Sequence, residues 1–346
     1  MDLGHNKKIA RVVLDDLTRE TTYECFAERS SFEGHMVDYE TSPIRVENDE
    51  QREARQNDLR SEMRRAGKAL LQIYPDGNTR AIKSITAEGD RVVAEYLVHA
   101  GRTIFDADVE HNFHVVKVFE FDRGKIVRMR EYCDSAYLQA HAGPIAEFMH
   151  HTRLGTATEP APAHSGWNSD WCLAGPEIRI ESDDTTPHVD QLTSNKETVL
   201  ALSRNWGTGE MADSLHDDVF FNNEIDLAVS PVLGRGITGR EQLVAAAGRA
   251  VAPFDGTLTR TITALTAESN RVVLEEELSA TATPGTGTPF RTRTAKICLL
   301  RDGKVFRIRQ HLDSAYVQAH VPDLVHRVFE PAEPAPSASR DGQGPP

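Results

Sequence analysis

The chain has 346 residues, enough for two domains of ordinary size, and 39% of them are hydrophobic, which supports packed cores and excludes wholesale disorder. Its 39 Lys and Arg residues face 53 Asp and Glu residues, a formal net charge of -14 that argues against electrostatic binding to nucleic acid or to anionic membranes. No run approaches the roughly 18 apolar residues of a membrane helix. The first residues contain no signal-like apolar core, so we expect a cytoplasmic protein.

The first part of the chain is predicted to form helices and then strands. Apolar residues at three- and four-residue spacings predict a helix over 8–17, an extended piece follows at 35–39, and a charged second helix covers 51–71. Runs rich in β-branched residues then predict four strands, at 80–87, 91–99, 112–121 and 125–133. The dipeptides Gly89-Asp90 and Arg123-Gly124 predict the two hairpin turns between them.

The middle segment, at about 151–194, is rich in Pro, Ala, Thr, Ser and acidic residues, which is typical of a linker. Beyond it the same order of elements returns, with helices predicted over 198–206 and 240–251, an extended piece between them and Thr238 as N-cap of the second helix. Four strands follow, at 259–266, 271–279, 291–300 and 304–312. The tail from 331 to 346 has the composition of a disordered end.

The two parts of the chain are copies of one another. Residues 124–141 (GKIVRMREYCDSAYLQAH) and 303–320 (GKVFRIRQHLDSAYVQAH) are identical at eleven of eighteen positions. The stretches TAEGDRVVAE and TAESNRVVLE upstream are identical at seven of ten. We therefore predict two tandem domains, at 1–150 and 195–330, each an α+β unit of helices followed by an antiparallel sheet.

Several kinds of chemistry find no support in the sequence. It contains no Gly-rich phosphate loop, no GxSxG elbow and no HExxH motif, which argues against nucleotide-dependent, serine-hydrolase and zinc-protease activities. The four cysteines form no CxxC pair, and the histidines show no metal-ligand spacing. We expect reduced thiols, no metal and no cofactor.

The Gly-Arg-Glu of residues 239–241 before a helix, together with the closing patterns of 84–141 and 262–320, resembles the NTF2-like superfamily and, within it, the SnoaL-like and ketosteroid-isomerase-like branch. The resemblance implies a curved sheet wrapped around helices into a cone with an apolar pocket. Because members of this fold often dimerise, it also implies that the two copies pack as an intramolecular pseudo-dimer, and a homodimer of the whole chain stays open.

The resemblance also implies an activity. It points to a cofactor-independent acid/base enzyme of the isomerase, cyclase or dehydratase (lyase) type, which acts on a small, largely apolar substrate in secondary metabolism such as antibiotic biosynthesis. The same fold includes proteins without catalysis, so a non-catalytic small-molecule-binding or dimerisation module is the alternative.

Two aspartates near the end of the last strand are the first catalytic candidates. In cyclases and epoxide hydrolases of the superfamily, an aspartate there reaches the pocket as an acid/base, and Asp134 and Asp313 match that position. An apolar surrounding would raise the pKa of such a carboxyl towards neutrality. Each also precedes Ser-Ala-Tyr, so helix capping is the alternative. Asp38 aligns loosely with the base of ketosteroid isomerases, and the second copy has Asn222 there.

The remaining site residues follow from strand parity, because alternate residues share one face. That face carries Ile126, Arg128, Arg130, Tyr132 and Asp134 in the first copy, and Val305, Arg307, Arg309, His311 and Asp313 in the second. The predicted substrate-binding residues are Tyr39, Glu95, His99, Arg130, Tyr132, Glu275, Arg309 and His311. For the glutamates, the alternative is an ion pair with an arginine on a strand surface. For the arginines, it is an interface between the two domains.

Overall fold

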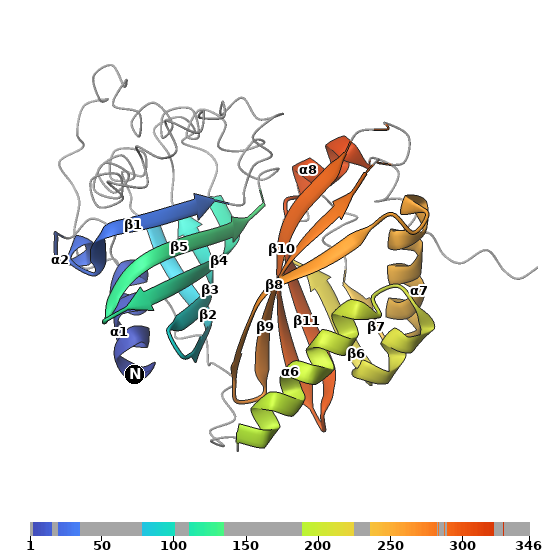
Figure 1. Ribbon diagram of the computed structural model, residues 1–346, viewed down its shortest axis with the longest axis horizontal. Helices are drawn as coiled ribbons and strands as arrows, with labels where there is room; N and C mark the ends of the chain where they lie inside the picture. The colour runs from blue at the N-terminus through green and yellow to red at the C-terminus, as the bar shows by residue number, and fades with distance from the viewer. Residues whose placement is uncertain are drawn as a thin grey trace, which may run out of the picture.

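The computed structural model describes residues 3–15, 20–34, 78–100, 111–134, 189–224, 236–281, 283, 287, 289–321 and 328. These residues form two sheets, each accompanied by its own helices (Figure 1). We call the elements from α1 to β5 the first repeat and the elements from α6 to α8 the second repeat.

The described part of the first repeat contains two helices and five strands. Helices α1 (Leu3–Asp15) and α2 (Glu20–Tyr23) come first, and the strands are β1 (Phe26–Gly34), β2 (Asn78–Glu88), β3 (Arg91–Ala100), β4 (His111–Asp122) and β5 (Lys125–Cys133). The order in the sheet is β1-β5-β4-β3-β2. Strand β1 pairs parallel with β5, and the other neighbours pair antiparallel, so the sheet is mixed where we predicted a purely antiparallel one.

The second repeat has the same plan with more of its helices described. Its helices are α6 (Val189–Arg204), η2 (Gly209–Ser214), α7 (Arg240–Val251), η3 (Ala252–Phe254) and α8 (Ser314–His320). Its strands are β6 (Leu215–Asn223), β7 (Ile237–Thr238), β8 (Thr259–Glu268), β9 (Arg271–Ala280), β10 (Phe290–Arg301) and β11 (Lys304–His311). The order β7-β6-β11-β10-β9-β8 repeats that of the first sheet with one short strand added. The predicted pair of tandem α+β units is confirmed.

The hairpins turn where the sequence predicts. Arg123 and Asp302 have φ of 48° and 53°, and Gly124 and Gly303 follow with φ of 74° and 72°. Two successive residues with positive φ make the turn type whose twist matches that of the flanking strands. Each repeat therefore closes its last hairpin with the same backbone geometry.

Other predicted boundaries differ from the structure. Strand β1 lies ahead of the extended piece predicted at 35–39, which falls outside the described residues, as does the predicted helix 51–71. Helix α6 begins at Val189, within the segment predicted as linker. The N-cap of α7 is Gly239, with φ of 94°, and not Thr238, which belongs to β7. A positive φ of this size favours glycine over threonine.

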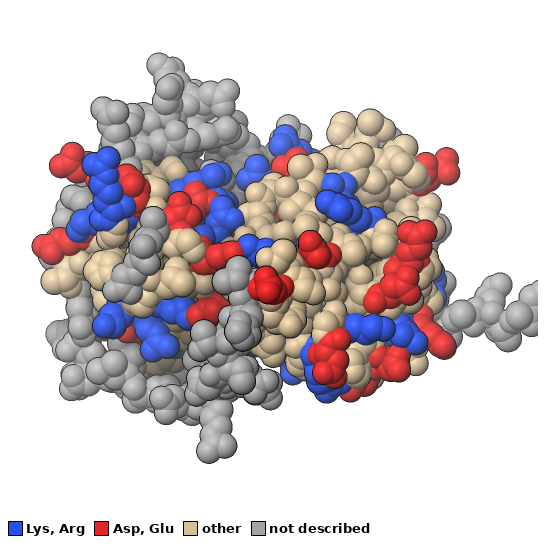
Figure 2. All heavy atoms as spheres, turned by 60° about the horizontal axis from the view of Figure 1, so that its bottom comes forward, with Lys and Arg blue, Asp and Glu red and all other residues tan. Residues whose placement is uncertain are grey.

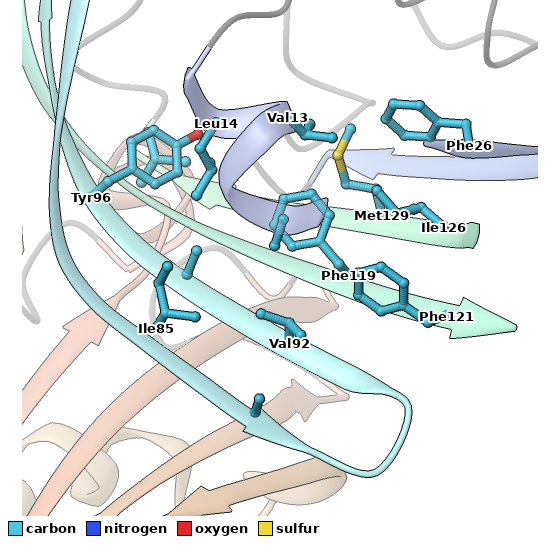
Figure 3. Packing of buried hydrophobic residues seen from close by; sticks show 14 of the residues in the cluster. Val13, Leu14, Phe26, Ile85, Val92, Tyr96, Phe119, Phe121, Ile126 and Met129 are labelled. Carbon is cyan, nitrogen blue, oxygen red and sulfur yellow. The ribbon is translucent and has the colours of Figure 1, made fainter. Parts of the chain in front are cut away.

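Each repeat buries a hydrophobic core on the side of the sheet that carries its helices, which we call the inner face. In the first repeat, Val13 and Leu14 of α1 lie against the sheet beside Phe119, Val92 and Met129 (Figure 3). The second repeat has an equivalent core, formed by residues such as Val199, Leu202, Leu243, Val272, Cys298 and Ile308. The two cores share no residues, so each repeat has its own hydrophobic core, as a separate domain does.

The other sides of the two sheets, their outer faces, pack against each other and form what we call the seam. A third hydrophobic cluster fills it, with members from both repeats: Val93, Val116, Val118, Tyr132, Val273, Ala295 and Ile297. Charged contacts at its edge are reciprocal, because Lys7 of α1 pairs with Glu268 and Lys196 of α6 pairs with Glu88. The same glutamates accept hydrogen bonds from backbone N–H groups of the opposite repeat, at 2.9 and 2.8 Å. The two sheets thus contact each other through an apolar centre and reciprocal charged contacts.

Candidate functional site

Strand alternation divides the predicted site residues between the inner and outer faces. On β3, Val92 and Tyr96 belong to the core of the first repeat, whereas Val93 belongs to the seam. On β5, the pairing with β4 shifts register between Ile126 and Arg128. This irregularity leaves Ile126 in the core and places Arg130 and Tyr132 on the other face, whereas Met129 and Cys133 on either side of them stay in the core.

The prediction that Ile126 and Val305 share a face with the arginines is therefore wrong. Val305 likewise belongs to the core of the second repeat, and β11 has the matching register shift. The face that carries Arg130, Tyr132 and Arg309 is the outer one. These side chains lie in the seam and not in a pocket inside either sheet, so for the arginines the structure agrees with the alternative of an interface between the domains.

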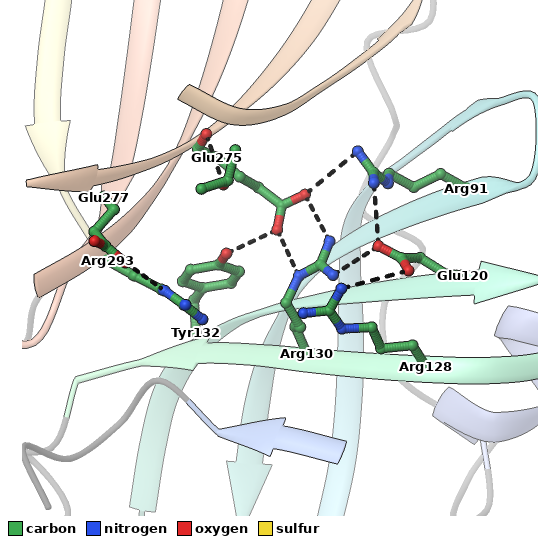
Figure 4. A network of polar contacts seen from close by, with 9 residues as sticks. Arg91, Glu120, Arg128, Arg130, Tyr132, Glu275, Glu277 and Arg293 are labelled. Carbon is green, nitrogen blue, oxygen red and sulfur yellow. Dashed lines mark hydrogen bonds and ion pairs between the residues drawn. The ribbon is translucent and has the colours of Figure 1, made fainter. Parts of the chain in front are cut away.

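A network around Glu275 occupies one half of the seam (Figure 4). Arg130 of the first repeat donates two hydrogen bonds to the Glu275 carboxylate, from Nε at 2.9 Å and Nη2 at 3.1 Å. The Tyr132 hydroxyl donates a third at 2.7 Å. Arg130 also donates to Glu120 at 2.6 Å, and Arg91 lies between the two carboxylates. Burial and the charge of Glu275 raise the pKa of Tyr132, which keeps its hydroxyl a donor.

The other half of the seam contains the reciprocal network around Glu95, which is 0% exposed. Arg309 of the second repeat donates two hydrogen bonds to its carboxylate, from Nε and Nη2, both at 2.6 Å. Ser84 donates at 3.1 Å, and His311 Nε2 lies 3.6 Å from Oε1. Burial alone would raise the pKa of Glu95, but His311 and Arg309 outweigh it and hold this pKa far below its usual range. Both predicted glutamates are thus buried and paired with arginines across the seam.

The two candidate aspartates are buried next to helix α8. Asp313 is the N-cap of α8, and its Oδ1 accepts a hydrogen bond from the backbone N–H of Tyr316 at 3.2 Å. Asp134, from the first repeat, accepts from the Ser314 backbone N–H at 3.0 Å and from the Ser314 hydroxyl at 2.7 Å. The first turn of α8 is therefore held by one carboxylate from each repeat. Whether either aspartate also acts on a substrate stays a prediction.

The remaining candidates are placed as follows. Asp38 and Tyr39 lie outside the described residues. In the backbone register, Asn222 of β6 is paired with Arg309 and Glu33 of β1 is paired with Arg130. Glu33, and not Asp38, is therefore the position equivalent to Asn222, so the predicted alignment is wrong by five residues. His99 is exposed near the end of β3, opposite Thr79.

A buried charged cluster that the sequence did not predict lies on the inner face of the second repeat. Its centre is Glu276 on β9, which is 1% exposed. The Glu276 carboxylate accepts hydrogen bonds from Lys296 on β10, from Arg260 on β8 at 3.1 Å, and from Ser203 on α6 at 2.7 Å. The cluster thus combines side chains from four elements, α6, β8, β9 and β10. The hydroxyl of Thr294, also on β10, lies 3.4 Å from Glu276 Oε1.

Trp206, just after α6, covers the two cations of this cluster. Lys296 Nζ lies 4.1 Å from the centre of the Trp206 ring, and Arg260 Cζ lies 5.5 Å from it. Cations over an indole face are attracted to its electrons. A sequence signal did exist, since a lysine interrupts an apolar run at the same place in both repeats, in VVKVF at Lys117 and TAKIC at Lys296.

The protonation of the cluster follows from burial and from its close charges. Burial alone would raise the pKa of Glu276, but Lys296 and Arg260, with the hydrogen bond from Ser203, hold it below its ordinary value. Burial lowers the pKa of Lys296, Arg260 lowers it further, and Glu276 opposes both. Without a substrate, Glu276 is thus an ionised carboxylate held between two cations, Lys296 and Arg260, in the interior of the second repeat. Such a group can accept a proton, and its cations can stabilise an oxyanion.

Some features bear on partners and cofactors. In the described ranges, no group of three or more His, Cys, Asp or Glu side chains is placed to hold a metal ion. None of the helices that the structure describes is long and apolar enough to cross a membrane. On the face drawn in Figure 2, acidic and basic side chains are interspersed over both repeats.

One family model matches part of the chain, most of it in the second repeat. Residues 177–308 match the family model described as the SnoaL-like domain, a range that runs from before α6 into β11. A search of curated proteins gives no match.

Many solved structures resemble parts of the chain, and three of them serve as examples. A candidate SnoaL-like polyketide cyclase from a Jannaschia species is 20% identical, covers 40% of this chain and 97% of its own, and has a TM-score of 0.33. A protein with a ketosteroid isomerase-like fold from Catenulispora acidiphila, in complex with trimethylamine, is 20% identical, with coverage of 40% and 95% and a TM-score of 0.30. An NTF2-like protein from Anabaena variabilis is 16% identical, with coverage of 37% and 94% and a TM-score of 0.31.

Proposed function

We propose that this chain of two tandem NTF2-like units, the second of them a SnoaL-like domain, catalyses a cofactor-free proton transfer on a small, largely apolar carbonyl compound inside its second repeat. One observation carries the proposal: Glu276 is a fully buried carboxylate held by Lys296 and Arg260 on the inner face of the second repeat. Buried charge clusters cost stability relative to apolar packing, so such a cluster marks a candidate functional site.

The proposed reaction begins with abstraction of a proton next to a carbonyl group. Glu276 accepts the proton from carbon, the C–H electron pair forms the carbon–carbon double bond, and the carbonyl π pair moves onto oxygen. Lys296 and Arg260 donate hydrogen bonds to that oxyanion. In an isomerisation, Glu276 then returns the proton to a different carbon. In a cyclisation, the enolate carbon attacks a second carbonyl of the same molecule, and the alkoxide formed takes the proton from Glu276.

The balance of forces on Glu276 favours this role. Burial is the largest single influence on the pKa of Glu276, and it raises this pKa. The two cations together lower it by more, so the net shift is downward. A substrate oxygen that draws hydrogen bonds from Lys296 and Arg260 releases the carboxylate from them. Its pKa then rises, and the carboxylate becomes a stronger base when the substrate is in place.

The test measures deuterium exchange into 2-tetralone, a bicyclic apolar ketone, in D2O. The rate is obtained from the decay of the α-proton NMR signal of the ketone. We expect the protein to accelerate exchange over buffer, and Glu276→Gln to reduce the catalysed rate on the order of a hundredfold or more. Glu277→Gln is the matched control, because Glu277 is the adjacent residue on the outer face, where it pairs with Arg291. Equal rates for wild type and Glu276→Gln, with the variant folded by circular dichroism, would refute the proposal.

A non-catalytic binding protein is the second candidate. The engagement of Asp134 and Asp313 with helix α8 favours it, because both carboxylates have a structural partner. That function predicts saturable binding of 2-tetralone without any acceleration of exchange.

A further inference from the structure

The two central ion pairs of the seam have different neighbours. Arg293 and Tyr132 flank one of them, the network around Glu275 (Figure 4). The alignment of the repeats places His114 and His311 at the equivalent positions beside the other pair. Arginine and tyrosine side chains keep one charge state around neutral pH, whereas a histidine gains a proton in mildly acidic solution. One half of the seam thus carries histidines where the other has groups of fixed charge.

His114 on β4 has its carboxylate neighbour in the opposite repeat. In the backbone register His114 pairs with Leu97 of β3, whereas the equivalent Arg293 pairs with Glu277, to which it is also ion-paired. The Nδ1 atom of His114 instead lies 3.1 Å from Oε2 of Glu224, which follows β6. This nitrogen is buried and makes no hydrogen bond with any residue that the structure describes. The imidazole is therefore part of the contact between the repeats.

The Glu224 carboxylate already has other partners. Lys83 Nζ of β2 donates to Oε2, the same oxygen that lies next to His114, at 2.9 Å. Asn222 Nδ2 donates to Oε1 at 2.9 Å. The charge of Glu224 is thus neutralised by a lysine of the first repeat, and a protonated His114 would be a second cation on one buried oxygen.

The charges around this contact are balanced without the histidines. Charged and titratable groups surround His114 and Glu224 from four strands: Lys83 of β2, Glu95 of β3, and Arg309 and His311 of β11, with Glu224 itself at the end of β6. Two carboxylates and two permanent cations in this set offset each other. Burial is the largest influence on the pKa of His114 and lowers it, and Lys83 and His311 act in the same direction. The carboxylates oppose this shift, yet the pKa falls to about 4, so the imidazole is neutral at pH 7.

We propose that the seam is a proton-sensitive contact, in which a proton taken up by His114 separates the two repeats at the edge next to Glu224. Once this edge opens, water solvates the imidazolium, so the open state binds one more proton than the closed state. The closed state is therefore weakened as the pH falls below the ordinary histidine value of about 6.5. The inference concerns the contact between the repeats and holds whether or not the second repeat is an enzyme.

The test measures how often the seam opens, by alkylation of a thiol placed in its apolar cluster. Val116→Cys is the reporter, because Val116 is 0% exposed in the closed seam. The full chain is treated with N-ethylmaleimide at pH 7.5 and at pH 5.5, and labelling at position 116 is followed by peptide mass spectrometry. Each rate is divided by the rate for the urea-unfolded chain at the same pH, which cancels the pH dependence of the thiol itself. We expect this ratio to rise about tenfold from pH 7.5 to pH 5.5, one decade for the one pH unit below 6.5.

Three variants in the reporter background identify the group that responds. His114→Gln should reduce the rise to less than about twofold, because no proton is taken up at the contact. His99→Gln is the matched control, since His99 is an exposed histidine of the same sheet, and it should keep the tenfold rise. Lys83→Met leaves Glu224 to pair with the imidazolium, so its rise should be smaller than that of the unsubstituted reporter.

Three results would overturn the inference. The ratio stays constant or falls in acid, it rises tenfold in His114→Gln as well, or it rises in Lys83→Met as much as with Lys83 present. The pKa of Glu95 lies far below this pH range, so protonation of that carboxylate does not contribute.

Discussion

The seam offers the sharpest test of stability, through the ion pair of Glu95 and Arg309. Both hydrogen bonds from the guanidinium are 2.6 Å long, and the carboxylate is fully buried. Arg309→Met removes both guanidinium hydrogen bonds and leaves that carboxylate buried in the seam, with a hydrogen bond from Ser84, with His311 Nε2 at 3.6 Å and with the charge of Arg271 close enough to act on it. Removing one member of a buried pair typically costs about 3–5 kcal/mol, because the other charge stays desolvated. We expect a loss of that size in the free energy of unfolding, measured by urea titration at pH 7.

The control is Arg291→Met. Arg291 makes a similar two-bond contact with Glu277, but its side chain is 69% exposed. Water already screens that pair, so its loss should cost less than about 1 kcal/mol.

The double variant, with Glu95→Met and Arg309→Met together, separates a desolvated charge from a simple loss of packing. Replacement of both partners by apolar residues of similar size should recover most of the stability, since no buried charge is left. Two results would refute the role of a desolvated charge: Arg309→Met lowers the free energy of unfolding by no more than Arg291→Met does, or the double variant is as unstable as Arg309→Met alone.

Three further outcomes follow from the same contacts. Asp313→Ala should lower the unfolding free energy by about 1 kcal/mol through loss of the α8 N-cap, whereas Asp313→Asn should change it little, as thermal unfolding will show. The pKa of Glu95 is lowered in the folded state, so the ionised carboxylate stabilises the fold fully at pH values well above the ordinary glutamate pKa. This contribution to the free energy of unfolding is lost as the pH falls below about 5. Glu95→Gln should therefore flatten that part of a curve of stability against pH. Glu88→Ala and Glu268→Ala should cost equal amounts in urea titrations, within about 0.5 kcal/mol, because their contacts are reciprocal; a large difference would contradict the pseudo-symmetry of the seam.

The fold could be predicted from the sequence because the repeat is strong and its turns are explicit. Eleven identities in eighteen positions fix the equivalence of the last hairpins, and dipeptides such as Asp302-Gly303 mark where they turn. Strand β1 was missed because its sequence, FAERSSFEG, shows no alternation of apolar and polar residues. Its pairing partner, β5, is distant in sequence, and only the tertiary fold reveals it.

The candidate site was harder to predict, for two physical reasons. A single register shift after Ile126 exchanges the faces on which odd- and even-numbered residues of β5 lie. Counting alternate residues in the sequence cannot detect such a shift. The arginines on that face pair with glutamates from the other repeat, such as Arg130 with Glu275, which are 145 positions apart in the chain. Lys117 on β4 pairs with Glu131 on β5, whereas the equivalent Lys296 on β10 pairs with Glu276 on β9. A comparison of aligned positions therefore hides the pair.

The proposed reaction places the proton transfer at Glu276 and not at Asp134 or Asp313, the aspartates next to helix α8. The most direct measurement is the rate of deuterium incorporation into 2-tetralone by Glu276→Gln, Asp134→Asn and Asp313→Asn, taken side by side at equal folded concentration. We predict that Glu276→Gln alone loses the catalysed exchange and that both aspartate variants retain it. Loss of exchange in either aspartate variant, with Glu276→Gln still active, would contradict the account.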